Sequence, residues 1–303
     1  VVASGGVKTG AKLYFSLLLL LESAMLGVFM ARDWSLFYVF WELTLLPLFF
    51  LIDRLGGQNR QRRQKAALNF VIYTMGGSVF ILIALLLLYD AVPTHSFSMS
   101  AIAEAALGLP LATQVWIFSG LFIGFCVKMA VFPMHGWAPL VYAEAPSAVP
   151  LISSGILLKM GGYGLLRAVE ALPGAAWTLR DWLAVSAFVT LLYGGILAWR
   201  QRDLIVMLAY SSISHMGVVL LGIAALNTAG VAGAVMQMLA HGLVAGTLFL
   251  LVGLLHARTH TRDIGDYSSL VRTMPRFAFF MVLALTAAVG LPGTAGFIAE
   301  LHV

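Results

Sequence analysis

Long apolar runs, separated by short polar segments, fill the sequence from residue 12 to its end. A helix needs about 20 residues to cross ~30 Å of hydrocarbon. No strand-like alternation competes with this pattern, and a helix satisfies its own backbone hydrogen bonds in lipid. The runs predict nine membrane spans: 12–31, 34–52, 67–89, 113–142, 150–170, 182–199, 203–225, 229–255 and 276–303.

Two of these spans contain helix breakers. Pro133 has no N–H to offer the carbonyl of Met129, so it frees a polar group beside Lys128. Pro292 interrupts the last span shortly before Glu300. Broken helices at corresponding places in two halves indicate inverted repeats around a central ion site.

The expected fold is therefore an all-α polytopic membrane bundle built from two inverted five-helix repeats. The first repeat would occupy residues 1–170, and the second, incomplete at its C-terminal end, residues 171–303. Residue 1 is valine and the apolar pattern runs on to the last residue. We therefore expect the chain to be an internal piece of a longer protein.

Composition agrees with a membrane protein. Of the 303 residues, 61% are hydrophobic and 10% charged, and the mean hydropathy is +0.95, whereas soluble domains carry about 25% charged residues. The net charge of +5 is no evidence for a nucleic-acid partner, because the location of the charges matters more than their sum. Cys126 is the single cysteine, which excludes an internal disulfide and a cysteine-ligated iron–sulfur cluster. We expect it to be a small buried hydrophobic residue.

The basic residues set the orientation. If the N-terminus is cytoplasmic, the outer face receives only Arg32, Arg167 and Arg180. This asymmetry satisfies the positive-inside rule. The inner face then receives Lys8, Lys12, Arg54, Arg60, Arg62, Arg63, Lys65, Arg200, Arg202, Arg258, Arg262, Arg272 and Arg276.

Ionisable side chains lie near the centres of several spans, where a charge costs roughly 2.5–3.5 kcal/mol on insertion scales. Such residues indicate a proton or ion path running sideways through the bundle. They are Glu22, Glu42, Lys128, Lys159, His215 and His241.

Glu42 and Lys128 form a candidate pair. One interpretation is a structural salt bridge that locks two helices. A functional switch is favoured, because a purely structural bridge in lipid is a costly substitute for apolar packing. Separating the two side chains makes it easier for the lysine to release its proton.

Lys159 lies at the centre of its span, about ten residues from either interface, so snorkelling explains it poorly. We expect it to carry protons. His215 and His241 fit either a proton relay or helix packing. Hydroxyl groups such as that of Ser211, together with ordered water, would link Lys159 to the second half of the bundle.

The remaining polar residues are less decisive. Glu300 follows the second break and is a further candidate carrier, while Glu144 fits a helix cap or a proton entrance equally well. His256 and His260 are four residues apart without a third ligand nearby, which argues against a metal site. His135 fits an interfacial or broken-helix position.

Several motifs resemble the antiporter-like subunits of respiratory complex I, most closely subunit 4, the bacterial M chain, and its cyanobacterial and plastid counterpart, the D chain. The resemblance covers nearly the whole chain, in order. The motifs that carry it are Phe40-Trp41-Glu42-Leu43, Val127-Lys128-Met129-Ala130-Val131-Phe132-Pro133-Met134-His135, Glu144-Ala145-Pro146-Ser147, Gly155-Ile156-Leu157-Leu158-Lys159-Met160-Gly161-Gly162-Tyr163-Gly164-Leu165-Leu166-Arg167, Tyr210-Ser211-Ser212-Ile213-Ser214-His215-Met216-Gly217, Ala240-His241-Gly242, Thr259-His260-Thr261-Arg262-Asp263-Ile264 and Leu291-Pro292-Gly293-Thr294-Ala295-Gly296-Phe297.

The resemblance implies a fourteen-helix family fold, of which this chain would hold the fourth to the twelfth helices. It also implies that Glu42 and Lys128 form a modulating pair, and that Lys159 is the central proton carrier. His215 and His241 would then be the bridge. Glu300 would be the proton-exit carboxylate. A glutamate at this position, where sister subunits usually have lysine, favours subunit 4. Glu22 matches an additional fourth-helix glutamate of the same subunit. The sequence departs from the family pattern at Leu140 and Tyr142, where Asp and His are usual.

These observations together predict a proton-translocating membrane-arm subunit of an NADH- or ferredoxin-driven quinone oxidoreductase. It would lie in a bacterial plasma membrane or a thylakoid membrane. The resemblance places quinone, flavin and iron–sulfur clusters in partner subunits and no redox centre in this chain. The alternatives are a subunit of a sodium/proton antiporter or membrane hydrogenase, and a structural spacer without transport.

Overall fold

The computed structural model describes residues 10–93 and 95–303, and this part of the chain contains helices and no strand. A π-helical turn, Ser153–Leu157, joins two of the helices. The α-helices are α1 Ala11–Met30, α2 Trp34–Leu43, α3 Leu45–Leu55, α4 Arg60–Ala91, α5 Met99–Ala105, α6 Leu111–Met129, α7 Trp137–Glu144, α8 Ala148–Ile152, α9 Leu158–Ala171, α10 Pro173–Thr178, α11 Arg180–Arg200, α12 Leu204–Ala224, α13 Thr228–Thr259, α14 Leu270–Thr273, α15 Pro275–Ala288 and α16 Ala295–His302.

Within the described residues, eight helices or helix pairs are long and apolar enough to cross a membrane, and they overlap the first eight predicted spans, of which the fourth ends at Met129 instead of at residue 142. The ninth predicted span, 276–303, consists of α15 and α16, which are separated by residues 289–294. With 14 and 8 residues, neither helix reaches ~30 Å by itself. The all-helical membrane bundle is therefore confirmed, including the predicted interruption of its last span.

The bundle is apolar outside and carries polar groups inside. Large apolar side chains cover the outer faces of the long helices, for example Leu19, Ile72, Trp199 and Leu243. In water such a surface would be unfavourable, but in lipid it is the expected one. Several polar side chains point inward and are buried, among them Thr44, Ser78, Lys128, Lys159, Ser154, Gln237 and His241.

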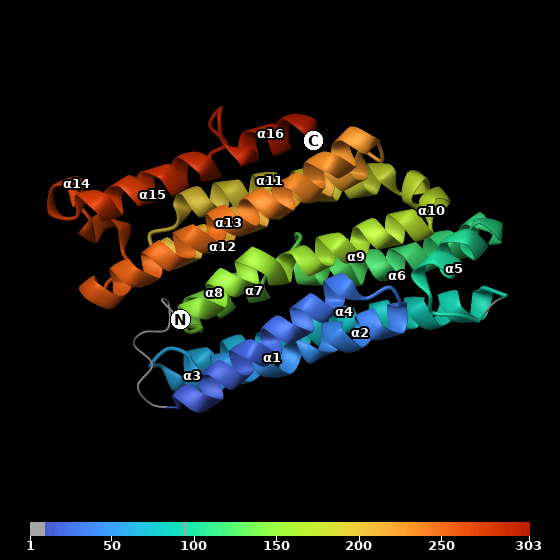
Figure 1. The fold of residues 1–303 in the computed structure, drawn as a ribbon, viewed down its shortest axis with the longest axis horizontal. Coiled ribbons are helices and arrows are strands. Elements are labelled where there is room, and N and C mark those ends of the chain that lie inside the picture. The colour runs from blue at the N-terminus through green and yellow to red at the C-terminus, as the bar shows by residue number, and fades with distance from the viewer. Residues whose placement is uncertain (1–9, 94) are drawn as a thin grey trace.

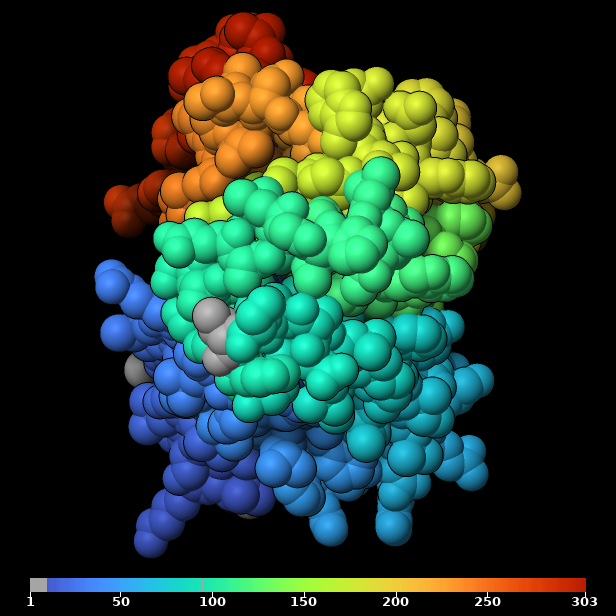
Figure 2. All heavy atoms as spheres, turned by 90° about the vertical axis from the view of Figure 1, so that its right-hand side faces the viewer, coloured from blue at the N-terminus to red at the C-terminus, as the bar shows by residue number. Residues whose placement is uncertain are grey.

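The long helices lie side by side along one direction (Figure 1). α1 to α4 form the lower part of the view, α6 to α9 the middle, and α11 to α16 the upper part; Figure 2 shows the same stacking from the end. The middle and upper parts meet where α13 packs against α8, the π turn and α9, and where α12 packs against α7 and α9. Lys159, His215 and His241 come from α9, α12 and α13, which meet at this junction.

In the first half, a loop is hydrogen-bonded to the start of α2. Asp33 caps the helix by accepting hydrogen bonds from N–H groups of the first turn at 2.8 and 3.2 Å. The N–H of Trp34 donates to the carbonyl of Phe97 at 2.8 Å, and the N–H of Met99 donates to the carbonyl of Arg32 at 3.0 Å. The loop before α5 is thereby fastened to the start of α2.

The second half repeats this arrangement. Asp203 caps α12 with hydrogen bonds of 2.8 and 3.1 Å. The N–H of Leu204 donates to the carbonyl of Arg262 at 3.0 Å, and the N–H of Ile264 donates to the carbonyl of Arg202 at 2.9 Å. Both halves also contain one helix of 32 residues just before the loop concerned, α4 and α13.

The two fastened loops lie at opposite ends of the bundle, next to α5 in one case and on the side of α14 in the other (Figure 1). This matched but opposite placement supports two inverted repeats. The division at residue 170 stays a prediction, and the short helix α10, just after it, packs against α6 and α9 of the first half.

Two breaks differ in detail from the expectation. The predicted span 34–52 is interrupted at Thr44, between α2 and α3. The sequence signal that was missed is Pro47, which cannot donate to the carbonyl of Leu43, four residues earlier.

In the fourth span the break begins before the proline that was expected to cause it. α6 ends at Met129, and Ala130 adopts a left-handed conformation with φ of 57°. The carbonyl of Val127, in the last turn, accepts hydrogen bonds from the indole N–H of Trp137 at 2.8 Å and from the N–H of Ala130 at 3.2 Å. The helix has therefore already ended four residues before Pro133.

α11 and α12 approach at backbone distance through two glycines. A Cβ on Gly194 would lie 2.6 Å from the backbone nitrogen of Ser214, and a Cβ on Gly217 would lie 2.6 Å from that of Leu191. Small residues permit such close packing of membrane helices. The pair Gly194 and Gly217 therefore fixes how α12 presents His215.

We expect Gly217→Leu to destabilise the protein, because the new side chain would collide with backbone and overpacking costs about 1–3 kcal/mol. The midpoint of thermal aggregation in detergent should fall clearly below that of the native protein. Gly76→Leu is the matched control, since a Cβ at Gly76 meets no atom within 4 Å. Equal midpoints for the two variants would contradict the close approach of α11 and α12.

Candidate functional site

Lys159 follows a widened turn of its helix. In the π-helical segment Ser153–Leu157 the N–H of Leu158 bonds to the carbonyl of Ser153, five residues back. In an α-helix that N–H would bond to the carbonyl of Ser154. The Ser154 carbonyl instead accepts a hydrogen bond from the Lys159 Nζ. The π turn thus provides a backbone acceptor for a buried amine, and such turns frequently occur at functional sites.

The second contact of Lys159 is with a histidine of the other half. Its Nζ lies 2.6 Å from the Nδ1 of His241 on α13, and both side chains are buried. The ring of His241 in turn lies against that of His215 on α12, with ring centres 4.9 Å apart. The structure thus brings three of the predicted residues together.

The contact between the halves is direct. The sequence favoured hydroxyl groups and water as the link, with Ser211 on the face of His215. In the structure Lys159 touches His241 without an intervening group. The neighbouring hydroxyl contact is made by Ser212, whose Oγ lies 2.9 Å from that of Ser154.

A glutamine connects the histidines to the last carboxylate. The Nε2 of Gln237 on α13 lies 3.1 Å from the Nδ1 of His215 and donates to the Oε1 of Glu300 at 3.3 Å. His215 and Glu300 are 3.7 Å apart by the same two atoms. The order in space is therefore Lys159, His241, His215, Gln237 and Glu300, which we call the lysine–glutamate row.

Sequence reasoning missed Gln237. The available signal was an uncharged polar side chain within an apolar span, one helical turn before His241 and therefore on the same face. Ser154 was missed for a different reason, because its contribution is a backbone carbonyl that becomes available only through the π turn.

Lys128 is buried beside the break between α2 and α3. Its Nζ donates to the Thr44 Oγ1 at 2.9 Å and lies 5.0 Å from the centre of the Trp41 ring. The Thr44 hydroxyl donates to the Trp41 carbonyl at 2.8 Å. The helix break thus holds an acceptor against the lysine.

Glu42 is close to Lys128 but not in contact with it. The ion pairs found among the described residues do not include these two side chains. Glu42 nevertheless interacts electrostatically with Lys128, and its Oε1 is buried without a hydrogen-bond partner. A buried carboxylate oxygen without a hydrogen-bond partner is unfavourable. The Oε1 of Glu42 can therefore accept a hydrogen bond from Lys128, once the lysine moves, or from water.

Other predicted residues stand apart from the row. Glu22 is on the outward face of α1, and its role stays a prediction. His135 is buried, with its Nδ1 unpartnered and its ring 4.9 Å from that of Tyr193. Cys126 is 1% exposed, as expected of a small buried hydrophobic residue.

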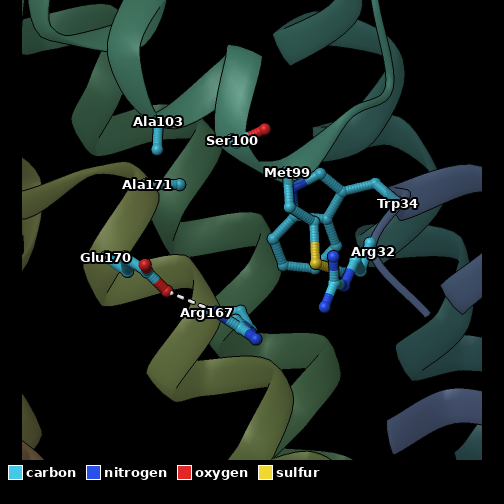
Figure 3. A pocket seen from close by; sticks show the side chains of 8 residues that line it. All are labelled: Arg32, Trp34, Met99, Ser100, Ala103, Arg167, Glu170 and Ala171. Atoms are coloured by element: carbon cyan, nitrogen blue, oxygen red, sulfur yellow. Dashed lines mark hydrogen bonds and ion pairs between the residues drawn. The ribbon is translucent and has the colours of Figure 1, made fainter. Parts of the chain in front are cut away.

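Two polar cavities lie near the fastened loops. One, of about 340 Å³, is lined by Arg32, Trp34, Met99, Ser100, Ala103, Arg167, Glu170 and Ala171. Arg167 and Glu170 form an ion pair of 2.8 Å; Figure 3 shows this pair, and the Arg32 side chain beside that of Trp34. The other, of about 560 Å³, contains Glu144, His256 and His260. Neither belongs to the row. Among the described residues, no group of three or more His, Cys, Asp or Glu side chains is arranged to hold a metal ion.

The fold and the lysine–glutamate row define an antiporter-like membrane protein. The chain belongs to the NADH:quinone oxidoreductase/Mrp antiporter transmembrane family, whose model matches residues 31–303.

Relatives agree with this assignment. The chain is 43% identical over 96% of its length to the NAD(P)H-quinone oxidoreductase chain 4 3 of Picosynechococcus, and 40% identical over 97% to the NADH-quinone oxidoreductase subunit M of Rickettsia conorii. It covers 52% and 59% of these proteins, so it spans about half the length of the curated relatives it matches. A chain of the respiratory complex I of Thermus thermophilus with bound NADH superposes with a TM-score of 0.90 and 32% identity, covering 96% of this chain and 62% of that one.

Proposed function

We propose that this chain is the transmembrane core of a proton-translocating membrane-arm subunit of an NADH- or ferredoxin-driven quinone oxidoreductase. The observation that carries the proposal is the unbroken row of side-chain contacts from Lys159 to Glu300, which crosses from one half of the bundle to the other. Intramembrane ionisable residues are rare and typically line ion or proton pathways.

The geometry suits a stepwise transfer. The Lys159 ammonium can pass a proton to His241 Nδ1 over 2.6 Å, leaving a neutral amine and an imidazolium. His215 is the next titratable group, with its ring centre 4.9 Å from that of His241. The proton passes to it once a ring rotation or a water brings a nitrogen of each ring within hydrogen-bonding reach. Glu300 receives it as the last group of the row and releases it towards one face. Each step returns the donor to its starting state once a new proton arrives.

Glu42 and Lys128 would couple this row to the rest of the complex. In the structure they are apart, and Lys128 bonds to Thr44. We infer that this is the separated state of the pair. When Glu42 and Lys128 come into contact, the electrostatic potential at the side chains of the lysine–glutamate row changes. Moving a charge against 100 mV requires ~2.3 kcal/mol, about the energy of two pKa units.

The partners in this proposal are further membrane-arm subunits of a complex I-like assembly, within a bacterial plasma membrane or a thylakoid membrane. Flavin, iron–sulfur clusters and quinone would be bound by those subunits and not by this chain. The energy of quinone reduction would reach this chain through the protein contacts between subunits.

A sodium/proton antiporter subunit is the second candidate, because the family description includes the Mrp antiporters. A structural spacer is a third. Vesicles that hold the purified complex separate the first two: acidification that needs NADH or ferredoxin supports the oxidoreductase, whereas proton flux driven by a sodium gradient alone supports the antiporter.

The row is tested by His241→Phe, which keeps an aromatic side chain but removes both ring nitrogens. Proton pumping by the whole complex in sealed vesicles should fall by about 100-fold, as expected on losing a positioned acid–base group. His256→Phe is the matched control on the same helix, since His256 bonds to the Thr261 carbonyl outside the row. Normal pumping by the His241 variant would exclude the row as the path.

A further inference from the structure

Gln237 occupies the one position in the row that cannot itself carry a proton. Its side chain is 1% exposed, and its Nε2 lies between His215 and Glu300 at 3.1 and 3.3 Å. The direct separation of 3.7 Å between the two titratable groups is too long for a hydrogen bond. The side-chain amide of Gln237 therefore separates the two groups between which the proton has to pass.

The amide orientation selects one set of protonation states. An amide nitrogen has two N–H donors and no acceptor capacity, so His215 Nδ1 and Glu300 Oε1 must both be acceptors. His215 also makes a backbone hydrogen bond at Ala288, the last residue of α15. A neutral imidazole fits both contacts, with its N–H directed to the backbone and its Nδ1 lone pair directed to the amide.

The other end of the same amide is unsatisfied. Gln237 Oε1 is buried and has no hydrogen-bond partner, which is uncommon for a buried carbonyl. Once Nδ1 of His215 or the carboxyl group of Glu300 carries a proton, that group becomes a hydrogen-bond donor. It then faces the N–H donors of the amide, and two donors repel each other. Turning the amide over would then place Oε1 where a donor needs it, without moving any backbone.

We propose that Gln237 is a positioning residue of the proton path, and that its amide turns over each time a proton passes between His215 and Glu300. With the nitrogen facing the pair, the lone pair of His215 is occupied and the proton waits on His241. With the oxygen facing the pair, His215 can hold a proton on Nδ1, and this proton passes to Glu300 Oε1 once the 3.7 Å between the two atoms shortens to hydrogen-bonding distance or one water joins them. The inference rests on the proposed function and deepens it.

Few other charged groups act on this position. Lys159 of α9 and His241 of α13 face His215, and Glu300 comes from α16. The cavity around Gln237 and Glu300 is otherwise lined by Ala240, Val244, Ala287, Ala288 and Gly296, which do not titrate. A change in the pH dependence of pumping on altering Gln237 can therefore be traced to the row.

The test is the pH profile of proton pumping by the intact complex in sealed vesicles. Gln237→Met has a similar shape but neither donates nor accepts strongly. We expect it to pump about tenfold more slowly, because two buried hydrogen bonds are lost, and to shift the pH profile by about one unit or more. Gln114→Met is the matched control: Gln114 is also buried, but it bonds to the Leu109 carbonyl, far along the chain from the row.

A merely structural role for Gln237 would lower pumping equally at every pH and leave the profile in place; that result overturns the inference. If Gln237→Met does not assemble, Gln237→Asn keeps the amide but is one methylene shorter, so it cannot reach both partners and should show the same shift. Wild-type profiles in the Gln237 variants together with no pumping in Lys159→Ala would reject only the role of Gln237. Normal pumping in Lys159→Ala would reject the proposed function itself.

Discussion

Replacing Lys159 with alanine is expected to abolish proton pumping while the complex still assembles. The alanine removes the group that bonds to both the Ser154 carbonyl and His241, so the row loses its first member. The remaining flux should be at least about 100-fold below that of the native complex, the usual contribution of a positioned proton-transfer group. Pumping is measured as NADH- or ferredoxin-driven acidification of sealed vesicles, with assembly followed on native gels.

Lys159→Arg makes this test sharper. A guanidinium keeps the positive charge and its hydrogen bonds but does not lose its proton in proteins. If Lys159 acts only as a structural cation, the arginine variant should pump; if it carries protons, the variant should fail like alanine. Lys65→Ala, at an exposed position of α4, controls for the loss of a lysine as such. Unchanged proton transport in Lys159→Ala would remove the central carrier from the mechanism.

The second large effect is expected for Glu42→Gln. The substitution keeps the shape but removes the charge that acts on Lys128, so the pair can no longer switch. Coupled turnover should fall by about tenfold or more, which corresponds to ~1.4 kcal/mol of lost interaction between the two side chains. The measurement is the number of protons moved per electron delivered to quinone.

Two comparisons decide what the Glu42 result means. Glu104→Gln, in α5 outside the predicted spans, should leave coupling unchanged. Lys128→Met distinguishes a switch from a spacer: loss of assembly without a selective loss of transport would favour the structural interpretation. Normal coupled turnover in Glu42→Gln would rule out the switching pair.

The spans could be predicted because each depends on its own composition. Twenty apolar residues must form a helix in lipid whatever they pack against, and the first eight predicted spans appear as such. The helix breaks were predicted less well. Pro47, in the first turn of α3, was overlooked as a cause of the break at Thr44, and α6 ends at Met129, four residues before Pro133.

The sequence predicted which residues belong to the candidate site but not which of them touch. Ionisable residues are conspicuous in an apolar sequence, so Lys159, His215, His241 and Glu300 could be selected without a structure. Their order in space could not. His241 follows His215 in the chain but lies next to Lys159, because α13 packs along the π turn with His241 facing the lysine, whereas α12 reaches the same turn through Ser212.

The sequence by itself determined that this protein is a helical membrane bundle with titratable groups at mid-depth, since hydropathy and charge act locally along the chain. Only the tertiary structure decided which of those groups touch. Contact depends on how far each helix is rotated and how closely backbones approach, as at Gly194 and Gly217, and both are set by packing between segments distant in sequence. For that reason Gln237 entered the row, whereas Glu22 faces outward.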